Sequence, residues 1–367
     1  MLKKVLLTTG GTGGHIFPAI ATAQKISEMY PGCEIVFAGG EYGPEREITQ
    51  KAGIKFKAFP ARGVLGRGIR SLGAMVWMVR SLAQSMKFIR SFKPQIVIGF
   101  GGYAGFMPVL AARWLKYPTA IHEQNSIPGV TNRILSKRVD KVMLSFPDIN
   151  GYFPPEKTVQ TGNPVRREFV EASRNSPELD RHKRRLLVLG GSQGARAVND
   201  AVVSSLSEFK ALGVEIWHQT GQNDFARVQK VYDREFPEAR VEPFIDNMVD
   251  AYSFATLVLC RAGASTISEL CAMGRPSVLV PFPYATHDHQ MINARHLEGL
   301  GAALVLAQSY LSEIHPARVI GDLLAAPDKL RNMGKAAMRE GKAEAAEEIV
   351  KQIEYLVSEK QGKTDRA

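Results

Sequence analysis

The sequence predicts an α/β protein made of two Rossmann-like, doubly wound domains that face a cleft. Short runs rich in Val and Ile alternate with helix-like segments, a pattern typical of a parallel sheet covered by helices on both faces. Two segments share the same order of an apolar run, a glycine loop and a helix-like stretch: "KKVLLTTGGTGGHIFPA" near the start and "RLLVLGGSQGARAVND" in the second half. With 367 residues, the chain is also long for one hydrophobic core.

Strands and helices are expected to alternate through the first half. Each expected strand is a short apolar run bounded by Gly, Pro or Asp, and each expected helix has a wider apolar spacing. Parallel strands place the loops that follow them at one edge of the sheet, where ligands of such folds bind. The strands are expected at residues 4–8, 34–38, 95–98, 119–121 and 141–144, and the helices at 16–29, 45–52, 71–91, 106–115 and 131–135.

A change of composition marks the expected domain boundary. The text "FPPEKTVQTGNPVRREF" contains Pro154, Pro155 and Pro164, which forbid a continuing helix, and a charged stretch follows. We therefore expect an N-terminal domain at 1–163 and a C-terminal domain at 164–367. A polar helix near 342–358 can pack back on the first domain. The strands of the second domain are expected at 186–189, 214–218, 240–243, 257–259, 277–280 and 303–305.

The composition is that of an ordinary globular protein, with 45% hydrophobic and 23% charged residues. No signal peptide is recognisable, and no uncharged apolar span reaches about 18 residues. The cysteines, Cys33, Cys260 and Cys271, lack C-x-x-C spacing, and their odd number argues against a disulfide framework. We expect a cytoplasmic location and no bound metal.

The net charge of +11 comes from one segment. From Ile48 to His122, 75 residues contain twelve Lys or Arg and no Asp or Glu. A basic segment of this kind can contact nucleic acid or an anionic membrane. We favour the membrane, because the sequence offers neither a groove-reading element nor a stacking platform for nucleic acid.

The helix expected at 71–91 lies inside this basic segment. One of its faces has the spacing of ordinary core packing, and Trp77, Met78 and Phe88 widen the apolar surface beyond that face. A wide apolar surface ringed by cations predicts attachment to an anionic membrane surface. The expected core face consists of Leu72, Met75, Val76, Val79, Leu82, Met86 and Ile89, and the expected membrane contacts are Arg67, Arg70, Trp77 and Arg80.

Three glycine loops follow expected strands: "TGGTGGH" at Thr9–His15, "GFGGYAG" at Gly99–Gly105 and "GGSQGA" at Gly190–Ala195. The first lacks the spacing of the dinucleotide fingerprint and of a P-loop. Each loop can be an ordinary tight turn, or it can open a helix whose N–H groups face a phosphate. Their occurrence together favours two phosphate-type sites on the first domain and one on the second.

Ionisable side chains stand at several of these loops. His15 ends the first one, where an imidazole can take a proton near neutral pH, although its position fits an ordinary helix start equally well. Glu269, in "CRAGASTISEL", can complement a helix start or accept hydrogen bonds from a ribose, and the nearby "GGSQGA" favours the ribose. His287 and His289 are two residues apart and point to different helix faces, so we prefer hydrogen bonds to a polar ligand over a metal site.

Six ordered motifs together resemble the MurG family, the bacterial N-acetylglucosaminyltransferases of peptidoglycan synthesis. They are "TGGTGGHIFPAIA", "GFGGYAGFMPVLAA", "HEQNSIPGVTNRILS", "TGNPVRREF", "GGSQGARAVND" and "DHQMINA", and the likeness extends from about Lys3 to Val350. The resemblance implies the glycosyltransferase B fold, with a lipid-linked acceptor on the N-terminal domain and UDP-GlcNAc on the C-terminal one. It also implies transfer of GlcNAc to lipid I, undecaprenyl-pyrophosphoryl-MurNAc-pentapeptide, which gives lipid II.

The resemblance implies a set of site residues as well. Ile245 would meet uracil through its backbone, and Glu269 would hold the ribose hydroxyls. His289 departs from the consecutive glutamines of some members, which leaves the sugar contact at this position open. The expected donor contacts are Thr12, Gly13, Gly14, Asn125, Arg166, Ser192, Ile245, Ala264, Ser265, Thr266, Glu269 and Gln290, and the expected acceptor contacts are Gly101, Gly102 and Tyr103.

We expect an inverting single displacement in which His15 takes the proton of the acceptor hydroxyl. Backbone N–H groups and Arg166 are expected to stabilise the leaving pyrophosphate without a metal or other cofactor. The expected partners are UDP-GlcNAc, lipid I, the cytoplasmic face of the cell membrane, and proteins of cell-wall synthesis and division. The alternatives are a UDP-GlcNAc 2-epimerase-like isomerase, another lipid glycosyltransferase of the same fold, and a nucleotide-regulated membrane-binding protein.

Overall fold

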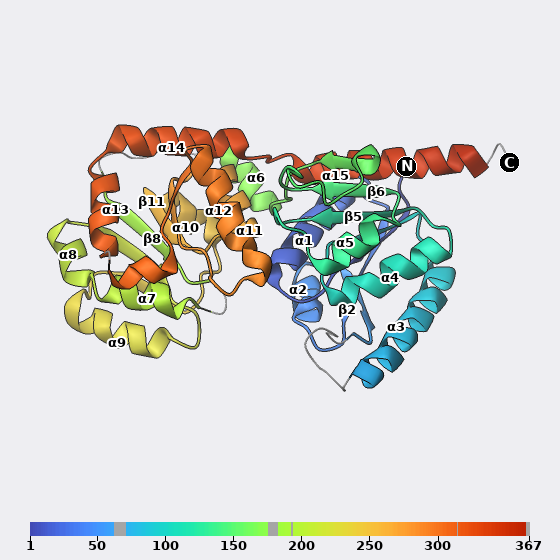
Figure 1. Cartoon of the computed structure of the whole chain (residues 1–367), viewed down its shortest axis with the longest axis horizontal. Coiled ribbons are helices and arrows are strands. Elements are labelled where there is room, and N and C mark those ends of the chain that lie inside the picture. Colours follow the sequence, from blue (N-terminus) through green and yellow to red (C-terminus); the bar gives the residue numbers. More distant parts are fainter. Residues whose placement is uncertain (62–70, 175–182, 192–193, 314, 365–367) are drawn as a thin grey trace. The chain divides into compact units, whose positions relative to one another are not determined.

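Two compact units make up the chain, and the computed structural model describes residues 1–61, 71–174, 183–191, 194–313 and 315–364. Unit 1 comprises Met1–Arg167 and Glu344–Ala367, and unit 2 comprises Glu168–Ala343. Each unit is a parallel sheet covered by helices (Figure 1). The division falls after Arg167, where the sequence placed it after residue 163, and the C-terminal helix belongs to unit 1.

Unit 1 contains seven strands: β1 (Lys4–Thr8), β2 (Glu34–Gly40), β3 (Lys55–Phe59), β4 (Ile96–Gly99), β5 (Thr119–Glu123), β6 (Lys141–Leu144) and β7 (Thr158–Gln160). Their order in the sheet is β3-β2-β1-β4-β5-β6-β7, and every pairing is parallel. The strand order therefore reverses between β1 and β4. Doubly wound sheets bind their ligands beside the carboxyl ends of the strands at this point.

The helices of unit 1 are α1 (Gly13–Met29), α2 (Glu45–Lys51), α3 (Ser71–Phe92), α4 (Tyr103–Trp114), α5 (Val130–Ser136) and α15 (Ala345–Thr364). They bury the two faces of the sheet separately. Leu7 of β1 packs in one cluster with Ile16 of α1 and Ile353 of α15. Leu6 points to the opposite face, because successive strand residues alternate, and joins Ile89 of α3 in a second cluster.

Unit 2 repeats the plan with six strands: β8 (Arg185–Leu189), β9 (Glu215–Gln219), β10 (Arg240–Glu242), β11 (Leu257–Cys260), β12 (Ser277–Leu279) and β13 (Ala303–Val305). Their order is β10-β9-β8-β11-β12-β13, again all parallel. β8 and β11 therefore correspond to β1 and β4. The helices are α6 (Arg167–Arg174), α7 (Arg196–Val203), α8 (Leu206–Ala211), α9 (Phe225–Glu235), α10 (Met248–Phe254), α11 (Ala264–Ala272), α12 (His289–Gly299), α13 (Pro316–Leu324) and α14 (Pro327–Glu340).

Two strands of unit 1 were not expected from the sequence. β3, "KFKAF", lies at one edge of the sheet and alternates exposed lysines with partly buried apolar residues, so it lacks the continuous apolar run of a central strand. β7 lies at the opposite edge and follows a short 3-10 turn, Pro155–Lys157, inside the stretch taken for a linker. The linker interpretation was therefore wrong for 158–160, because Pro154 and Pro155 precede the strand and Pro164 follows it, which leaves its own ladder intact.

The structure confirms part of the core face expected for α3, since Ile89 is buried and Leu82 and Met86 pack against the same cluster. Phe88, expected outside that face, packs there too. Ser81, Ser85 and Ile89 are buried, whereas Val76 and Val79, expected in the core, are 67% and 63% exposed. α3 packs against α4, and the two buried serines of α3 are positions that an apolar spacing does not predict to be in the core. Arg67 and Arg70 lie outside the described residues. Among the described residues, no helix combines the length and apolarity needed to cross a bilayer.

Candidate active site

The two glycine loops of unit 1 pack against each other, because β1 and β4 are neighbours. Gly102 has a φ of +74° and a ψ of 157°, a conformation open almost only to glycine. A Cβ at Gly102 would lie 1.9 Å from the carbonyl oxygen of Gly10. The Thr9 hydroxyl adds a hydrogen bond of 3.2 Å to the carbonyl of Gly101. These glycines therefore have a packing reason to be present, whatever ligand they also meet.

His15 lies on the first turn of α1, at the edge of this contact. Its ring covers Gly101, where a Cβ would lie 2.8 Å from Cδ2 and 3.2 Å from Nε2 of the imidazole. Thr12 Oγ1 is 3.4 Å from His15 Nδ1, and both side chains retain solvent exposure. The imidazole is thus held in place by the second glycine loop and remains accessible to a substrate.

A buried neutral histidine, His122 at the end of β5, lies close to this group. Burial lowers the pKa of His122 to about 4. Its Nε2 is 2.9 Å from the carbonyl oxygen of Gly162, which can only accept, so Nε2 carries the proton. Nδ1 then accepts a hydrogen bond from the amide of Gln124, which also donates to the carbonyl of Phe100. This network ties the end of β5 to the loop after β4.

Glu123 organises the loop that follows β5. Burial raises the pKa of its carboxyl group. The carboxyl oxygens accept hydrogen bonds from the backbone N–H groups of Asn125 and Gly129, each at 3.1 Å, and from the amide of Asn132 at 2.9 Å. Asn125, expected to contact the donor, is therefore positioned by Glu123, and its ligand contact stays a prediction.

Glu45, which the sequence analysis missed, lies beneath the first glycine loop. Its side chain is fully buried, and its Oε1 accepts a hydrogen bond of 2.8 Å from the backbone N–H of Gly11. The sequence "AGGEYGPE" could have indicated a buried Glu45, because three glycines precede this acidic helix start and leave space for its side chain.

Several expected site residues lie around the start of α1. Thr12 is its N-cap residue, Gly13 and Gly14 form its first turn, and the guanidinium of Arg166 lies 5.3 Å above the ring of Phe17. Tyr103, the first residue of α4, is 46% exposed. The structure thus brings the expected contacts of unit 1 to the carboxyl ends of its central strands.

In unit 2, the described part of the glycine loop packs against the end of β9. A Cβ at Gly194, whose φ is +77°, would lie 2.8 Å from the carbonyl oxygen of Thr220. Gly190 donates its N–H to the carbonyl of Gln219 at 2.9 Å. Ser192, an expected donor contact, lies outside the described residues.

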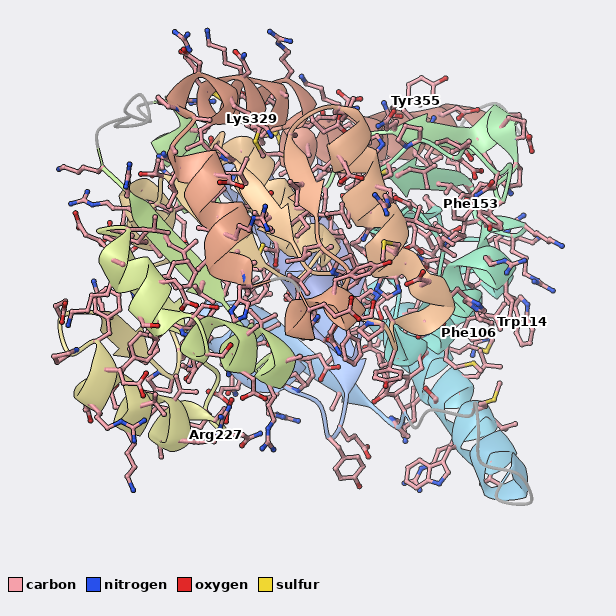
Figure 2. The ribbon with its side chains drawn as sticks, turned by 60° about the vertical axis from the view of Figure 1, so that its left-hand side comes forward. Phe106, Trp114, Phe153, Arg227, Lys329 and Tyr355 are labelled. Atoms are coloured by element: carbon pink, nitrogen blue, oxygen red, sulfur yellow. The ribbon has the colours of Figure 1, made fainter. Side chains whose placement is uncertain are left out.

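A second buried neutral histidine, His218, supports this loop from β9. Burial lowers its pKa to about 3. Asn199 of α7 donates through its amide to the carbonyl of Thr220 and to Asp224, so its oxygen accepts from His218 Nε2 at 3.0 Å. His218 Nδ1 in turn accepts from the hydroxyl of Tyr232. The carboxylate of Asp224 is paired with Arg227 of α9, labelled in Figure 2.

Glu269 lies in the middle of α11, and the first turn of that helix contains no acidic residue. The helix-start interpretation is therefore wrong, since the dipole effect falls off within the first turn. The hydroxyl of Tyr252 donates a hydrogen bond of 3.1 Å to Oε2 of Glu269. The expected contacts Ala264, Ser265 and Thr266 form the first turn of this helix.

The segment before α12 has unusual backbone geometry. His287 and Asp288, in the short helix Thr286–Asp288, have φ values of +53° and +54°, which L residues rarely adopt and which often mark functional sites. Gln290 accepts a hydrogen bond of 2.9 Å from the N–H of Phe282, and His289 contacts the carbonyl of Thr286.

Ile245, expected to meet uracil through its backbone, is 2% exposed. Across the part of the chain that the structure describes, no three His, Cys, Asp or Glu side chains are arranged to hold a metal ion.

Two family models match the chain, the glycosyltransferase family 28 N-terminal domain over residues 5–144 and its C-terminal domain over residues 185–352. A curated relative from Nitratidesulfovibrio vulgaris (strain DP4) is 52% identical over 95% of this chain and 96% of its own length. It is named UDP-N-acetylglucosamine--N-acetylmuramyl-(pentapeptide) pyrophosphoryl-undecaprenol N-acetylglucosamine transferase. A relative of the same name from Lawsonia intracellularis is 42% identical over 98% of this chain and 99% of its length. The crystal structure of Acinetobacter baumannii MurG is 32% identical, with a TM-score of 0.76 over 96% of this chain and 99% of that one.

The chain belongs to the MurG family.

The fold is therefore the glycosyltransferase B fold, as the sequence predicted. The calicheamicin glycosyltransferase CalG4 shares this fold with a TM-score of 0.65 at 17% identity, covering 98% of this chain and 99% of that one. A UDP-N-acetylglucosamine 2-epimerase shares it with a TM-score of 0.64 at 14% identity, covering 95% of each chain. At such identities the likeness shows the fold alone, whereas MurG-family membership also makes the chain an N-acetylglucosamine transferase.

Proposed function

We propose that this MurG-family chain moves N-acetylglucosamine from UDP-GlcNAc to the MurNAc 4-hydroxyl of lipid I and so forms lipid II. Relatives with up to 52% identity over nearly the full length carry the name of that transferase. The observation that supports a chemical centre in unit 1 is the His15 imidazole, held against Gly101 where the strand order reverses. We assign the acceptor to unit 1 and the nucleotide sugar to unit 2.

His15 is our candidate for the general base. The oxygen of the acceptor hydroxyl attacks C1 of GlcNAc from the face opposite UDP, the bond between C1 and the UDP oxygen breaks, and His15 takes the hydroxyl proton. General-base catalysis of this kind contributes about 10²–10⁴ in rate. His122 is a poor alternative because it is fully buried and both of its ring nitrogens are already engaged.

Unit 2 offers groups suited to the nucleotide. Glu269 can accept hydrogen bonds from both ribose hydroxyls, and Tyr252 orients its carboxylate. The N-terminus of α11 lies after the carboxyl end of the central strand β11, where its backbone N–H groups can stabilise the leaving diphosphate. We expect activity to persist in EDTA, and loss of activity on chelation would contradict a metal-free mechanism.

Unit 1 also offers a surface suited to lipid. Val76, Met78 and Val79 of α3 are exposed, as is Trp114 of the adjoining α4, which Figure 2 shows together with Phe106. Arg80 lies among them and is exposed, and Trp77 is half-buried. Apolar side chains ringed by cations favour anionic membrane surfaces.

Charge reversal tests this membrane assignment. Arg80→Glu, combined with the same change at Arg67 and Arg70, should release the protein from vesicles of anionic phospholipid in a sedimentation assay. Lys329→Glu, combined with the same change at Lys335 and Arg339, is an equal charge change at exposed positions of α14 in unit 2 and serves as the matched control, which should bind as before (Figure 2 labels Lys329). Retained vesicle binding in the triple variant would refute the assignment.

One assay tests the reaction itself. Radiolabelled UDP-GlcNAc incubated with lipid I should give labelled lipid II. Labelled UDP-ManNAc would instead identify an isomerase of the epimerase type, and no product from a folded, nucleotide-binding preparation would contradict catalysis.

A further inference from the structure

Glu45 occupies a niche that exists only because its neighbours are glycines. A Cβ at Gly43 would lie 1.7 Å from Oε2 of Glu45, one at Gly10 would lie 3.0 Å from Oε1, and one at Gly39 would lie 3.1 Å from its Cβ. The side chain is fully buried. Three backbone segments, the end of β2, the turn before α2 and the first glycine loop, therefore enclose one carboxylate.

The carboxylate makes a specific contact with the first glycine loop. Oε1 accepts the N–H of Gly11 at 2.8 Å, and Oε2 has no hydrogen-bond partner among the described residues. Burying a charged group this completely is costly, and one backbone hydrogen bond repays only part of that cost. A residue kept only for stability would be better replaced by an apolar one.

Glu47, two residues further on, shows what an ordinary helix-start acid does here. Both acids belong to the first turn of α2, where a negative charge complements the helix dipole. The side chain of Glu47 is 73% exposed and pairs with Lys51 at 2.9 Å. Complementing the dipole therefore does not require burial beneath the glycine loop, so Glu45 has a further task.

Unit 2 has an acidic residue, Asp224, at the position that corresponds to Glu45 in unit 1. β9 corresponds to β2, and Asp224, immediately before α9, follows β9 as Glu45 follows β2. Asp224 accepts a hydrogen bond of 2.7 Å from Asn199 on the helix that follows the glycine loop of unit 2. In both units an acid after the second strand thus restrains the first loop–helix connection, although among the described residues a cationic partner, Arg227, is found for Asp224 and none for Glu45.

We propose that Glu45 is a positioning residue of the transferase, which fixes the Gly10–Gly11 peptide and thereby the approach of the chain to His15. It does not touch substrate. Its carboxylate accepts a hydrogen bond from the N–H of Gly11, while Gly102 packs against the carbonyl of Gly10 in the same loop. The inference rests on the proposed function of this loop, and small displacements of a catalytic group can cost about 100-fold in rate.

Three substitutions separate the hydrogen bond from the packing. Glu45→Met fills the niche but accepts no hydrogen bond, Glu45→Gln keeps a neutral acceptor, and Glu45→Asp keeps the charge but is one methylene too short to reach Gly11. Glu47→Gln is the matched control on the same helix turn. Steady-state kinetics should be normalised to the concentration of UDP-binding sites, so that loss of folded protein does not count as loss of rate.

We expect kcat to fall about 10- to 100-fold in the Met variant and less in the Gln variant, while KM for UDP-GlcNAc changes less than about twofold and the control keeps wild-type values. Should the Met variant not fold, the Asp variant is expected to show the same fall in kcat. The proposal would be overturned if Glu45→Met or Glu45→Asp kept the wild-type kcat per binding site. It would also be overturned if kcat fell equally in the Glu47→Gln control.

A double variant separates this inference from the assignment of His15. If Glu45 acts through the loop that carries His15, adding Glu45→Met to His15→Ala should lower kcat little further, because neighbouring groups that act as a unit are not additive. Multiplicative losses would overturn the inference even if His15 is the base. Conversely, a fully active His15→Ala enzyme alongside an impaired Glu45 variant would reject His15 as the base and leave the positioning of the loop by Glu45 in place.

Discussion

In unit 1 two glycine loops pack against each other, whereas in unit 2 the described glycines of the loop after β8 pack against the end of β9. The buried neutral histidines also differ in place. His122 belongs to β5, two strands from β1, and His218 belongs to β9, the strand beside β8. The two units have the same topology, but the buried histidine lies on the β4 side of β1 in unit 1 and on the side of β8 away from β11 in unit 2.

This difference matches the chemistry proposed for each unit. In unit 1 the paired loops confine His15, for which we propose contact with the reacting hydroxyl at a fixed distance. In unit 2 the comparable network, through Asn199 and Asp224, contains the fully buried His218, and it holds the loop after β8 against the end of β9. The comparison teaches that repeated glycine loops can share a fold position without sharing a task.

The largest expected effect comes from closing the space between the paired loops. Gly102→Ala should lower the apparent free energy of unfolding by about 4 kcal/mol, because a glycine-only conformation and a clash with the Gly10 carbonyl add together. Gly194→Ala should cost less, and Gly151→Ala, with φ of +64° and open space around it, about 1 kcal/mol. Urea unfolding measures all three, and equal losses would show that backbone strain alone, without the contact between loops, sets the cost.

Low pH should destabilise both units, because their buried neutral histidines must take up a proton. The unfolded imidazole of His122 binds a proton near pH 6.5, whereas the folded one does so near pH 4, so stability present above pH 6.5 is lost as pH falls towards 4. Since one pKa unit corresponds to about 1.4 kcal/mol, His122 alone should cost about 3 kcal/mol at pH 4. His218, with a pKa of about 3, should take up its proton later, and Glu123, whose pKa is raised, offsets part of the loss.

Urea unfolding at pH 7 and pH 4.5, together with NMR titration of the imidazoles, measures this effect. Stability that did not change between the two pH values, or a His122 imidazole protonated at pH 6, would contradict the buried neutral state of that residue.

The kinetic role of unit 1 can be tested at His15. His15→Ala should lower kcat by about 100-fold and leave UDP-GlcNAc binding almost unchanged, because the donor is assigned to unit 2. Rates with saturating lipid I and the dissociation constant of UDP from calorimetry provide the two readouts. Full activity would remove His15 from the mechanism. Loss of UDP binding would contradict the assignment of the acceptor to unit 1 and of the nucleotide sugar to unit 2.

A smaller effect is expected in unit 2 at Tyr252. Tyr252→Phe removes the hydrogen bond to Glu269 and should raise KM for UDP-GlcNAc about fivefold at constant kcat, since one such bond contributes about 1 kcal/mol. Tyr310→Phe, an exposed tyrosine of the same unit, is the control. A fall in kcat with unchanged KM would argue against a ribose-binding role for Glu269.

The prediction from sequence worked best where the signal was local. The central strands β1, β8 and β11 are continuous apolar runs that a glycine or small-residue turn follows, and the expected ranges lie within about one residue of the observed ones. It failed at the edge strand β3, where alternating lysines hide the strand, and in the first half of α3, where Val76 and Val79 fit the apolar spacing but face solvent.

By itself the sequence determined the alternation of strands and helices, the positions of the glycine loops and the membership of the MurG family, because these depend on patterns within short segments. Only the tertiary structure decided that Gly102 lies against Gly10, that Glu45 is buried beneath Gly11, and that the valines of α3 face solvent. Those contacts join residues up to about ninety positions apart, and the order of strands in the sheet, which no local pattern encodes, brings them together.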